Sequence, residues 1–129
     1  MAHLLTHVLV VALGGGLGAS ARYLTNLAAL RALGPQFPWG TMTVNILGSF
    51  LMGLLIATLA RVSVTSAELR SFLATGFLGG FTTFSAFSLD FAVMWERGDQ
   101  WMSAVYLFAS VLLSITALFA GLFLVRALA

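Results

Sequence analysis

The sequence predicts an all-α membrane protein, and two observations lead to this fold class. First, 60% of the 129 residues are hydrophobic and 8% are charged, whereas about 25% of the residues in a soluble domain are charged. Second, glycine, proline and charged residues divide the chain into four apolar stretches, each near or above the roughly 20 residues that cross a bilayer as a helix. We therefore expect residues 1–129 to form a single domain of four transmembrane helices.

The first two helices are separated by a turn rich in glycine and proline. We expect the first helix at about residues 4–29, because Gly34 and Pro35 follow it and favour a turn. We expect the second helix at about residues 39–61, ending at Arg61. Arginine at the end of an apolar stretch is typical of an anchor at the membrane edge.

The last two helices are bounded by polar residues. We expect the third helix at about residues 67–96, with Glu68 near its start. The fourth helix is expected at about residues 100–126, with Arg126 at its end. No linker or low-complexity segment points to a second domain.

The third helix contains the run GFLGGFTTFSAFS at residues 76–88, which holds only glycine, aromatic, hydroxyl-bearing and aliphatic residues. We expect the helix to break within this run, near the bilayer midplane. Backbone groups that are freed in hydrocarbon have no water to bond, so non-helical backbone there is tolerated only where it is buried in protein or lines a cavity. Such breaks often mark an ion or substrate site.

The arginines are distributed almost evenly between the two sides of the membrane. With four spans, the chain ends share one side, and the arginines are Arg61, Arg70 and Arg126 on that side and Arg31, Arg97 and, near the interface, Arg22 on the other. The positive-inside rule therefore has little asymmetry to act on. This count favours insertion in both orientations and an antiparallel, dual-topology homodimer, and it is equally compatible with a weakly biased insertion in one orientation.

Two helices carry polar side chains at helical spacing, which places each set on one face. The stripes are Ser103, Tyr106, Ser110 and Ser114 on the fourth helix, and Thr41, Asn45 and Ser49 on the second. A single buried hydroxyl in a membrane helix more often bonds a preceding carbonyl or a neighbouring helix than an ion. Two stripes beside a broken helix favour a polar track through the protein.

The residues leave the sign of the transported charge open. An anion would be held by hydroxyls, the Asn45 amide and freed backbone N–H groups, and such weak binding permits release. Phe84 and Phe87 could contribute the partially positive edges of their rings, although core packing is the simpler role for most phenylalanines, including Phe91. Alternatively, carbonyls exposed around residues 79–83 could bind a cation such as Na⁺.

Other functional classes lack the residues that they need. Asp90 is the one acidic residue expected within the membrane, and a bond to a neighbouring helix or a place at the interface explains it better than a proton relay. No nucleophile, base and orienting acid converge and no metal-ligand cluster occurs, so we do not expect an enzyme. The scattered arginines do not form the basic patch of a nucleic-acid-binding protein.

Three motifs, each on its own helix, resemble one family over essentially the whole chain. They are GGGLGASARY at residues 14–23, GTMTVNILGSFLMG at residues 40–53 and GFLGGFTTFSAF at residues 76–87. In this order they are highly specific, and the chain resembles the small bacterial fluoride channels of the Fluc or CrcB family. The resemblance implies a dual-topology antiparallel homodimer with two fluoride pores and a structural Na⁺ at its centre.

The resemblance also implies roles for individual residues. Phe84 and Phe87 would face fluoride with their ring edges, and Asn45 would donate a hydrogen bond in the pore. The Na⁺ would be bound by the backbone carbonyls of Gly79 and Thr82, contributed by both subunits.

Further matches concern the polar track and the pore entrance. Tyr106, Ser110 and Ser114 match the family's polar track, and Arg22 matches an arginine near the pore entrance. The chain departs from the family pattern at Ala86, where members often have threonine, so one hydroxyl of the broken segment is missing.

The residues and the resemblance together predict a fluoride-selective ion channel that exports fluoride passively across the bacterial inner membrane. The expected partners are the fluoride ion, the lipid bilayer and a second copy of the chain, without an organic cofactor. The alternatives are a non-conducting accessory membrane subunit and one half of a heterodimeric channel.

Overall fold

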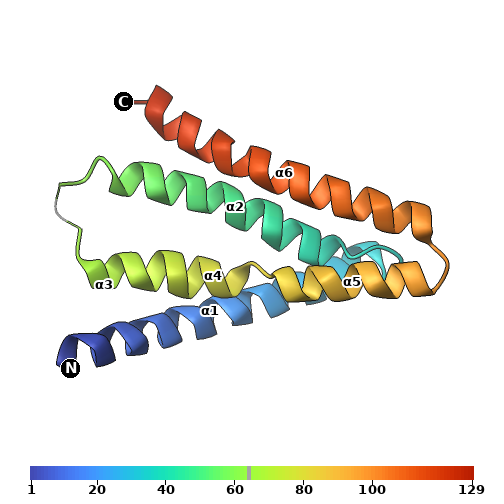
Figure 1. Cartoon of the computed structure of the whole chain (residues 1–129), viewed down its shortest axis with the longest axis horizontal. Coiled ribbons are helices and arrows are strands. Elements are labelled where there is room, and N and C mark those ends of the chain that lie inside the picture. Colours follow the sequence, from blue (N-terminus) through green and yellow to red (C-terminus); the bar gives the residue numbers. More distant parts are fainter. Residues whose placement is uncertain (64) are drawn as a thin grey trace.

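Four long helical spans lie side by side in the computed structural model, which describes residues 1–63 and 65–129 (Figure 1). Both chain ends lie at the same end of the bundle. Among the described residues, the spans long and apolar enough to cross a membrane are Ala2–Leu33, Trp39–Leu59, Ala67–Glu96 and Gln100–Ala127. The prediction of an all-helical chain with four such helices is confirmed.

Helix α1 (Ala2–Leu33) ends at a glycine. Gly34 has a φ of 82°, which glycine adopts without strain, and its N–H donates to the Leu30 carbonyl. The helix is longer than the expected residues 4–29, because polar residues near its end do not interrupt it. Thr25, for example, donates its hydroxyl to a carbonyl one turn earlier in the same helix.

Helices α2 (Trp39–Leu59) and α6 (Gln100–Ala127) form the most extensive helix pair in the described chain. Their backbones approach closely at Gly53 and Gly121, where a Cβ atom added to either residue would overlap backbone atoms of the other helix. Lipid supplies no hydrophobic force between helices, so packing at small residues is a main source of attraction. These two glycines therefore set the distance between α2 and α6.

The first half of the third span consists of three short helical segments. Helix α3 (Ala67–Arg70) begins after Ser66, whose hydroxyl accepts a hydrogen bond from the Leu69 N–H. The π-helix η1 (Ser71–Leu78) and helix α4 (Gly79–Phe81) continue the span. Both pack along α1, and π-helical turns are frequent at functional sites.

The second half of the span begins after two residues that are not helical. Thr82 has φ and ψ of −85° and 158°, and Thr83 has −154° and 124°, which are extended conformations. Helix α5 (Phe84–Glu96) starts directly after them, and Figure 1 shows the step between α4 and α5. The step lies within residues 76–88, roughly in the middle of the span Ala67–Glu96.

A second close contact joins α1 to the third span. A Cβ atom on Gly18 would overlap the Phe77 carbonyl, and one on Gly14 would approach the Phe72 carbonyl oxygen too closely. The GxxxG pair of α1 therefore faces η1. This contact fixes the first half of the third span against α1, on one side of the non-helical step.

We expect Gly18→Ala to lower the free energy of unfolding by about 1–3 kcal/mol, the usual cost of overpacking, because its methyl group meets backbone that cannot rotate away. The matched control is Gly16→Ala on the same helix, where a Cβ atom meets nothing within 4 Å. The control should keep or raise the thermal midpoint, since alanine favours helix over glycine. Equal midpoints for the two variants in detergent would contradict the close contact.

Candidate functional site

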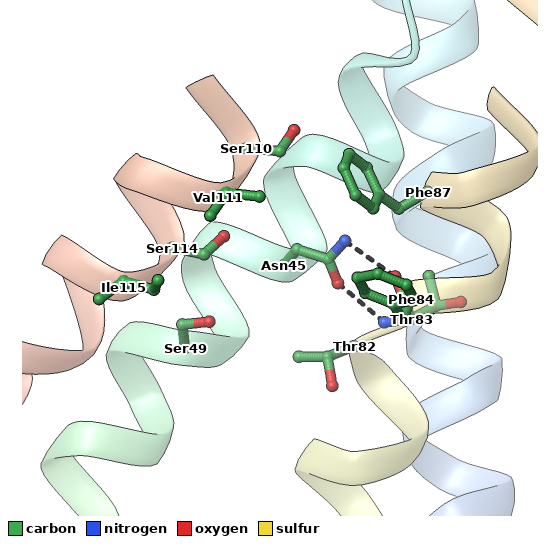
Figure 2. Close-up of a pocket in the computed structure, with 10 residues that line it drawn as sticks. All are labelled: Asn45, Ser49, Thr82, Thr83, Phe84, Phe87, Ser110, Val111, Ser114 and Ile115. Atoms are coloured by element: carbon green, nitrogen blue, oxygen red, sulfur yellow. Dashed lines mark hydrogen bonds between the residues drawn. The ribbon is translucent and has the colours of Figure 1, made fainter. Parts of the chain in front are cut away.

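A cavity of about 300 Å³ lies between α2, α6 and the start of α5, beside the non-helical step of the third span (Figure 2). Its lining combines hydroxyl, amide, aromatic and aliphatic side chains, and none of these described residues is charged. They are Asn45, Ser49, Thr82, Thr83, Phe84, Phe87, Ser110, Val111, Ser114 and Ile115. Apart from Tyr106, every residue predicted for the pore lines this cavity.

The Asn45 side chain holds the non-helical step in place. Its Oδ1 accepts a hydrogen bond from the Thr83 N–H at 2.8 Å, and its Nδ2 donates to the Thr83 carbonyl at 2.9 Å (Figure 2). The Thr83 hydroxyl in turn accepts a bond from the Ala86 N–H at 3.1 Å, as an N-cap residue does. One amide thus pairs with both backbone polar groups of one residue, and one Nδ2 hydrogen is left for the cavity.

These bonds remove the helical hydrogen-bond donors of two carbonyls, one in α4 and one in the step. In an α-helix the N–H of one residue bonds the carbonyl four residues earlier, so the Thr83 N–H would serve Gly79 and the Ala86 N–H would serve Thr82. Both N–H groups are used elsewhere. The carbonyls of Gly79 and Thr82 therefore lose their helical partners, and these are the two carbonyls for which the resemblance implies Na⁺ binding.

Arg22 contacts the third span and is not part of the cavity lining. Its Nε donates to the Gly80 carbonyl at 3.0 Å, which would otherwise accept from the Phe84 N–H in a continuous helix. The guanidinium therefore satisfies a carbonyl that lies between Gly79 and Thr82 in the sequence, and it places a positive charge beside the step. A role at the pore entrance stays a prediction.

Ser110 and Ser114 carry buried hydroxyls that make no hydrogen bond within the described residues. Both side chains line the cavity (Figure 2). Some other helical hydroxyls donate to a carbonyl of their own helix, as Ser20 does at 2.7 Å and Ser88 at 3.0 Å. Buried polar groups are normally satisfied, so two unpartnered hydroxyls on one cavity wall indicate a place for a polar or ionic guest.

Phe84 and Phe87 form an aromatic wall of the cavity. Their ring centroids lie 5.5 Å apart with an interplanar angle of 64°, an edge-to-face arrangement in which the partially positive edge of one ring meets the face of the other. Phe87 is 5% exposed, whereas Phe84 is 77% exposed. The cavity is therefore bounded on the Phe84 side by a ring that the chain itself leaves largely uncovered.

Tyr106 is fully buried beside the aromatic wall, with its ring centroid 5.2 Å from that of Phe87. Its hydroxyl donates to Oδ2 of Asp90 at 3.0 Å and so joins α6 to α5. This bond agrees with the interpretation of Asp90 as a partner of a neighbouring helix. Tyr106 continues the α6 stripe of Ser110 and Ser114 beyond the cavity.

The residue that sequence reasoning did not single out is Thr83. A hydroxyl residue directly before an apolar helical stretch is a recognised N-cap signal. The local sequence therefore indicates that the Thr83 hydroxyl accepts a bond from the Ala86 N–H. No local signal predicts its pairing with Asn45, because the two residues lie 38 positions apart in the sequence.

Comparison with known proteins places the chain in one family. The sequence profile of the family described as "CrcB-like protein, Camphor Resistance (CrcB)" matches residues 9–122. A protein of Mesorhizobium japonicum named "Fluoride-specific ion channel FluC" is 59% identical over 122 residues, which are 95% of this chain and 98% of that protein. A protein of the same name from Chelativorans is 59% identical, over 95% of this chain and 98% of that protein. Another from Rhodospirillum centenum is 56% identical, over 92% of this chain and 94% of that protein.

We expect Tyr106→Phe to lower the free energy of unfolding by about 1–3 kcal/mol, because the part-buried Asp90 carboxylate loses its donor. Tyr23→Phe is the matched control, since Tyr23 is 67% exposed on α1, and its thermal midpoint should stay at the wild-type value. A midpoint for Tyr106→Phe that equals the control would show that the bond contributes nothing to stability.

Proposed function

Because the chain belongs to the CrcB family, we propose that it is a fluoride-selective ion channel that exports fluoride passively across the bacterial inner membrane. The name shared by its relatives and four helices of membrane-spanning length support this proposal. HF enters a cell from acidic surroundings and dissociates inside, and the trapped anion would leave through the channel down its electrochemical gradient. Fluoride resistance of the cell follows from this flow.

The observation that carries the proposal is the uncharged cavity with two unpartnered hydroxyls. Ser110 and Ser114 can each donate a hydrogen bond to an anion, and the remaining Nδ2 hydrogen of Asn45 is a third donor. The N–H groups of Phe84 and Ser85 in the first turn of α5 have no helical acceptor and lie at the positive end of the helix. These donors carry no formal charge, so they bind an anion weakly enough to release it.

Selectivity for fluoride over chloride follows from the same groups. Fluoride is small and strongly hydrated, so dehydrating it costs a large free energy. The pore must compensate this cost with several fixed hydrogen-bond donors that replace the water. The rings of Phe84 and Phe87 form a wall that limits the width available to a larger halide. Fixed donors and a rigid wall together favour the smallest anion.

We further propose that two copies of the chain assemble as an antiparallel, dual-topology homodimer. The ring of Phe84, 77% exposed at the cavity, would be covered by a second copy, which would also exclude lipid from the pore. The nearly even distribution of arginines permits insertion in both orientations. A twofold-symmetric dimer carries two equivalent pores.

A structural Na⁺ at the dimer centre would use the carbonyls of Gly79 and Thr82 from both copies. Both carbonyls lose their helical donors, and unwound backbone carbonyls are common Na⁺ ligands in membrane proteins. The step lies roughly in the middle of Ala67–Glu96, which supports a place near the bilayer midplane. Hydrocarbon offers no partner for freed backbone there, so the cation would supply the missing electrostatic stabilisation.

The purified chain, reconstituted alone in liposomes, should release fluoride rapidly and chloride negligibly under the same gradient, with a fluoride electrode and a chloride electrode as detectors. Flux of both anions would overturn the proposed selectivity. Folded, dimeric protein without any flux would overturn the proposal in favour of an accessory subunit or one half of a heterodimeric channel.

We expect Phe84→Ile and Phe87→Ile to reduce the fluoride efflux rate by about tenfold or more, equivalent to ~1.4 kcal/mol, because side-chain bulk is largely retained while the ring edge is lost. Phe123→Ile is the control, since Phe123 is 73% exposed on α6 and lies outside the cavity lining. Its efflux should equal that of the wild type. Normal efflux from both cavity variants would assign the two rings to packing.

A further inference from the structure

The helical hydrogen bonds of the third span stop at one residue. The Thr82 N–H still donates to the Leu78 carbonyl at 3.0 Å, the helical partner four residues earlier. The next donor along the chain, the Thr83 N–H, donates instead to Oδ1 of Asn45 at 2.8 Å. The helical hydrogen-bond pattern therefore ends at Thr83, whose N–H bonds to the Asn45 side chain of α2.

The Gly79 carbonyl has two possible states as a result. A backbone N–H in hydrocarbon must find an acceptor. Without the Asn45 side chain, the helical acceptor for the Thr83 N–H would be the Gly79 carbonyl, which would extend α4 by one bond. With Asn45 present, that carbonyl is available to another partner. Gly80 does not offer an equivalent carbonyl, because Arg22 already donates to it at 3.0 Å.

We infer that Asn45 is a positioning residue for the cation site, because its capture of the Thr83 N–H keeps the Gly79 carbonyl available for Na⁺. The inference rests on the proposed function, in which this carbonyl binds a structural cation. It gives Asn45 two partners, with Oδ1 acting on the step and the spare Nδ2 hydrogen facing the anion cavity. The anion path and the cation site therefore share one side chain.

The chemistry of the amide explains why this position needs asparagine. An amide both accepts and donates, so one side chain can pair with the N–H and the carbonyl of Thr83, at 2.8 Å and 2.9 Å. An aspartate could still accept from the N–H, but it could not donate to the carbonyl. A leucine of similar volume could do neither.

These differences allow the two roles of Asn45 to be separated by substitution. The readout is the thermal midpoint of the purified protein in detergent, titrated with NaCl against N-methylglucamine chloride at constant ionic strength, because a ligand that binds the folded state raises the midpoint. Wild-type protein should be stabilised by Na⁺. Asn45→Leu, or the smaller Asn45→Ala if the leucine variant does not fold, should need about tenfold more Na⁺ or lose the response.

Asn45→Asp should keep the Na⁺ response, because Oδ1 still accepts from the Thr83 N–H, while fluoride efflux from liposomes is lost to the negative charge in the anion path. Ser110→Ala is the control: it alters the cavity without touching the step, so its Na⁺ response should equal that of the wild type. A full Na⁺ response in Asn45→Leu, or a lost response in Asn45→Asp or Ser110→Ala, would overturn the inference.

The wild-type protein distinguishes failure of the inference from failure of the proposed function. Fluoride efflux without any Na⁺ stabilisation would overturn the inference and leave the channel function standing. The expected Na⁺ responses in a wild-type protein that passes no fluoride would support the positioning role and overturn the proposed conduction.

Discussion

Every backbone N–H and C=O group within a membrane needs a hydrogen-bond partner. The rest of this structure depends on that requirement. Most of these groups find their partner within their own helix. Thr82 and Thr83 have extended backbone, so backbone groups around them must bond to other helices. Asn45 supplies two of them from α2, and Arg22 satisfies the Gly80 carbonyl from α1. The non-helical step is therefore held by side chains of two other helices, and it exists only because the bundle assembles around it.

The same step produces opposite chemistry on its two sides. At the start of α5 it leaves N–H groups, which attract negative charge. At the end of α4 and within the step it leaves the carbonyls of Gly79 and Thr82, which attract positive charge. In a continuous helix all of these N–H and carbonyl groups would have helical partners. Separating them creates an anion cavity and a candidate cation site from one stretch of chain, without a charged side chain in the cavity lining.

The parts of this arrangement that depend on local sequence were predictable. Apolar length indicated the four spans, and the helical period placed Ser110 and Ser114 on one face, which the structure turns toward the cavity. The glycine-rich run at residues 76–88 indicated where the third span would depart from helix. The length of α1 was less predictable, because Thr25 bonds within its own helix instead of ending it.

Contacts between distant residues had no sequence signal. The pairing of Asn45 with Thr83 depends on how α2 lies against the third span, and the same holds for Arg22 and Gly80. The sequence indicated Asn45 only as a donor to an ion. The structure shows that the oxygen and one hydrogen of its amide are engaged with the backbone, so the amide has less capacity for an ion than its position in the stripe suggested.

The close contact of Gly53 with Gly121 has a consequence for biosynthesis. The chain is synthesised from its amino end, so α2 is made before α6, its main packing partner. Until α6 is made, the face of α2 that contains Gly53 lacks the neighbour against which it packs in the folded chain. The final packing therefore forms after the last span is released, by association of helices that are already inserted, and a chain that stops before α6 would leave α2 without its principal neighbour.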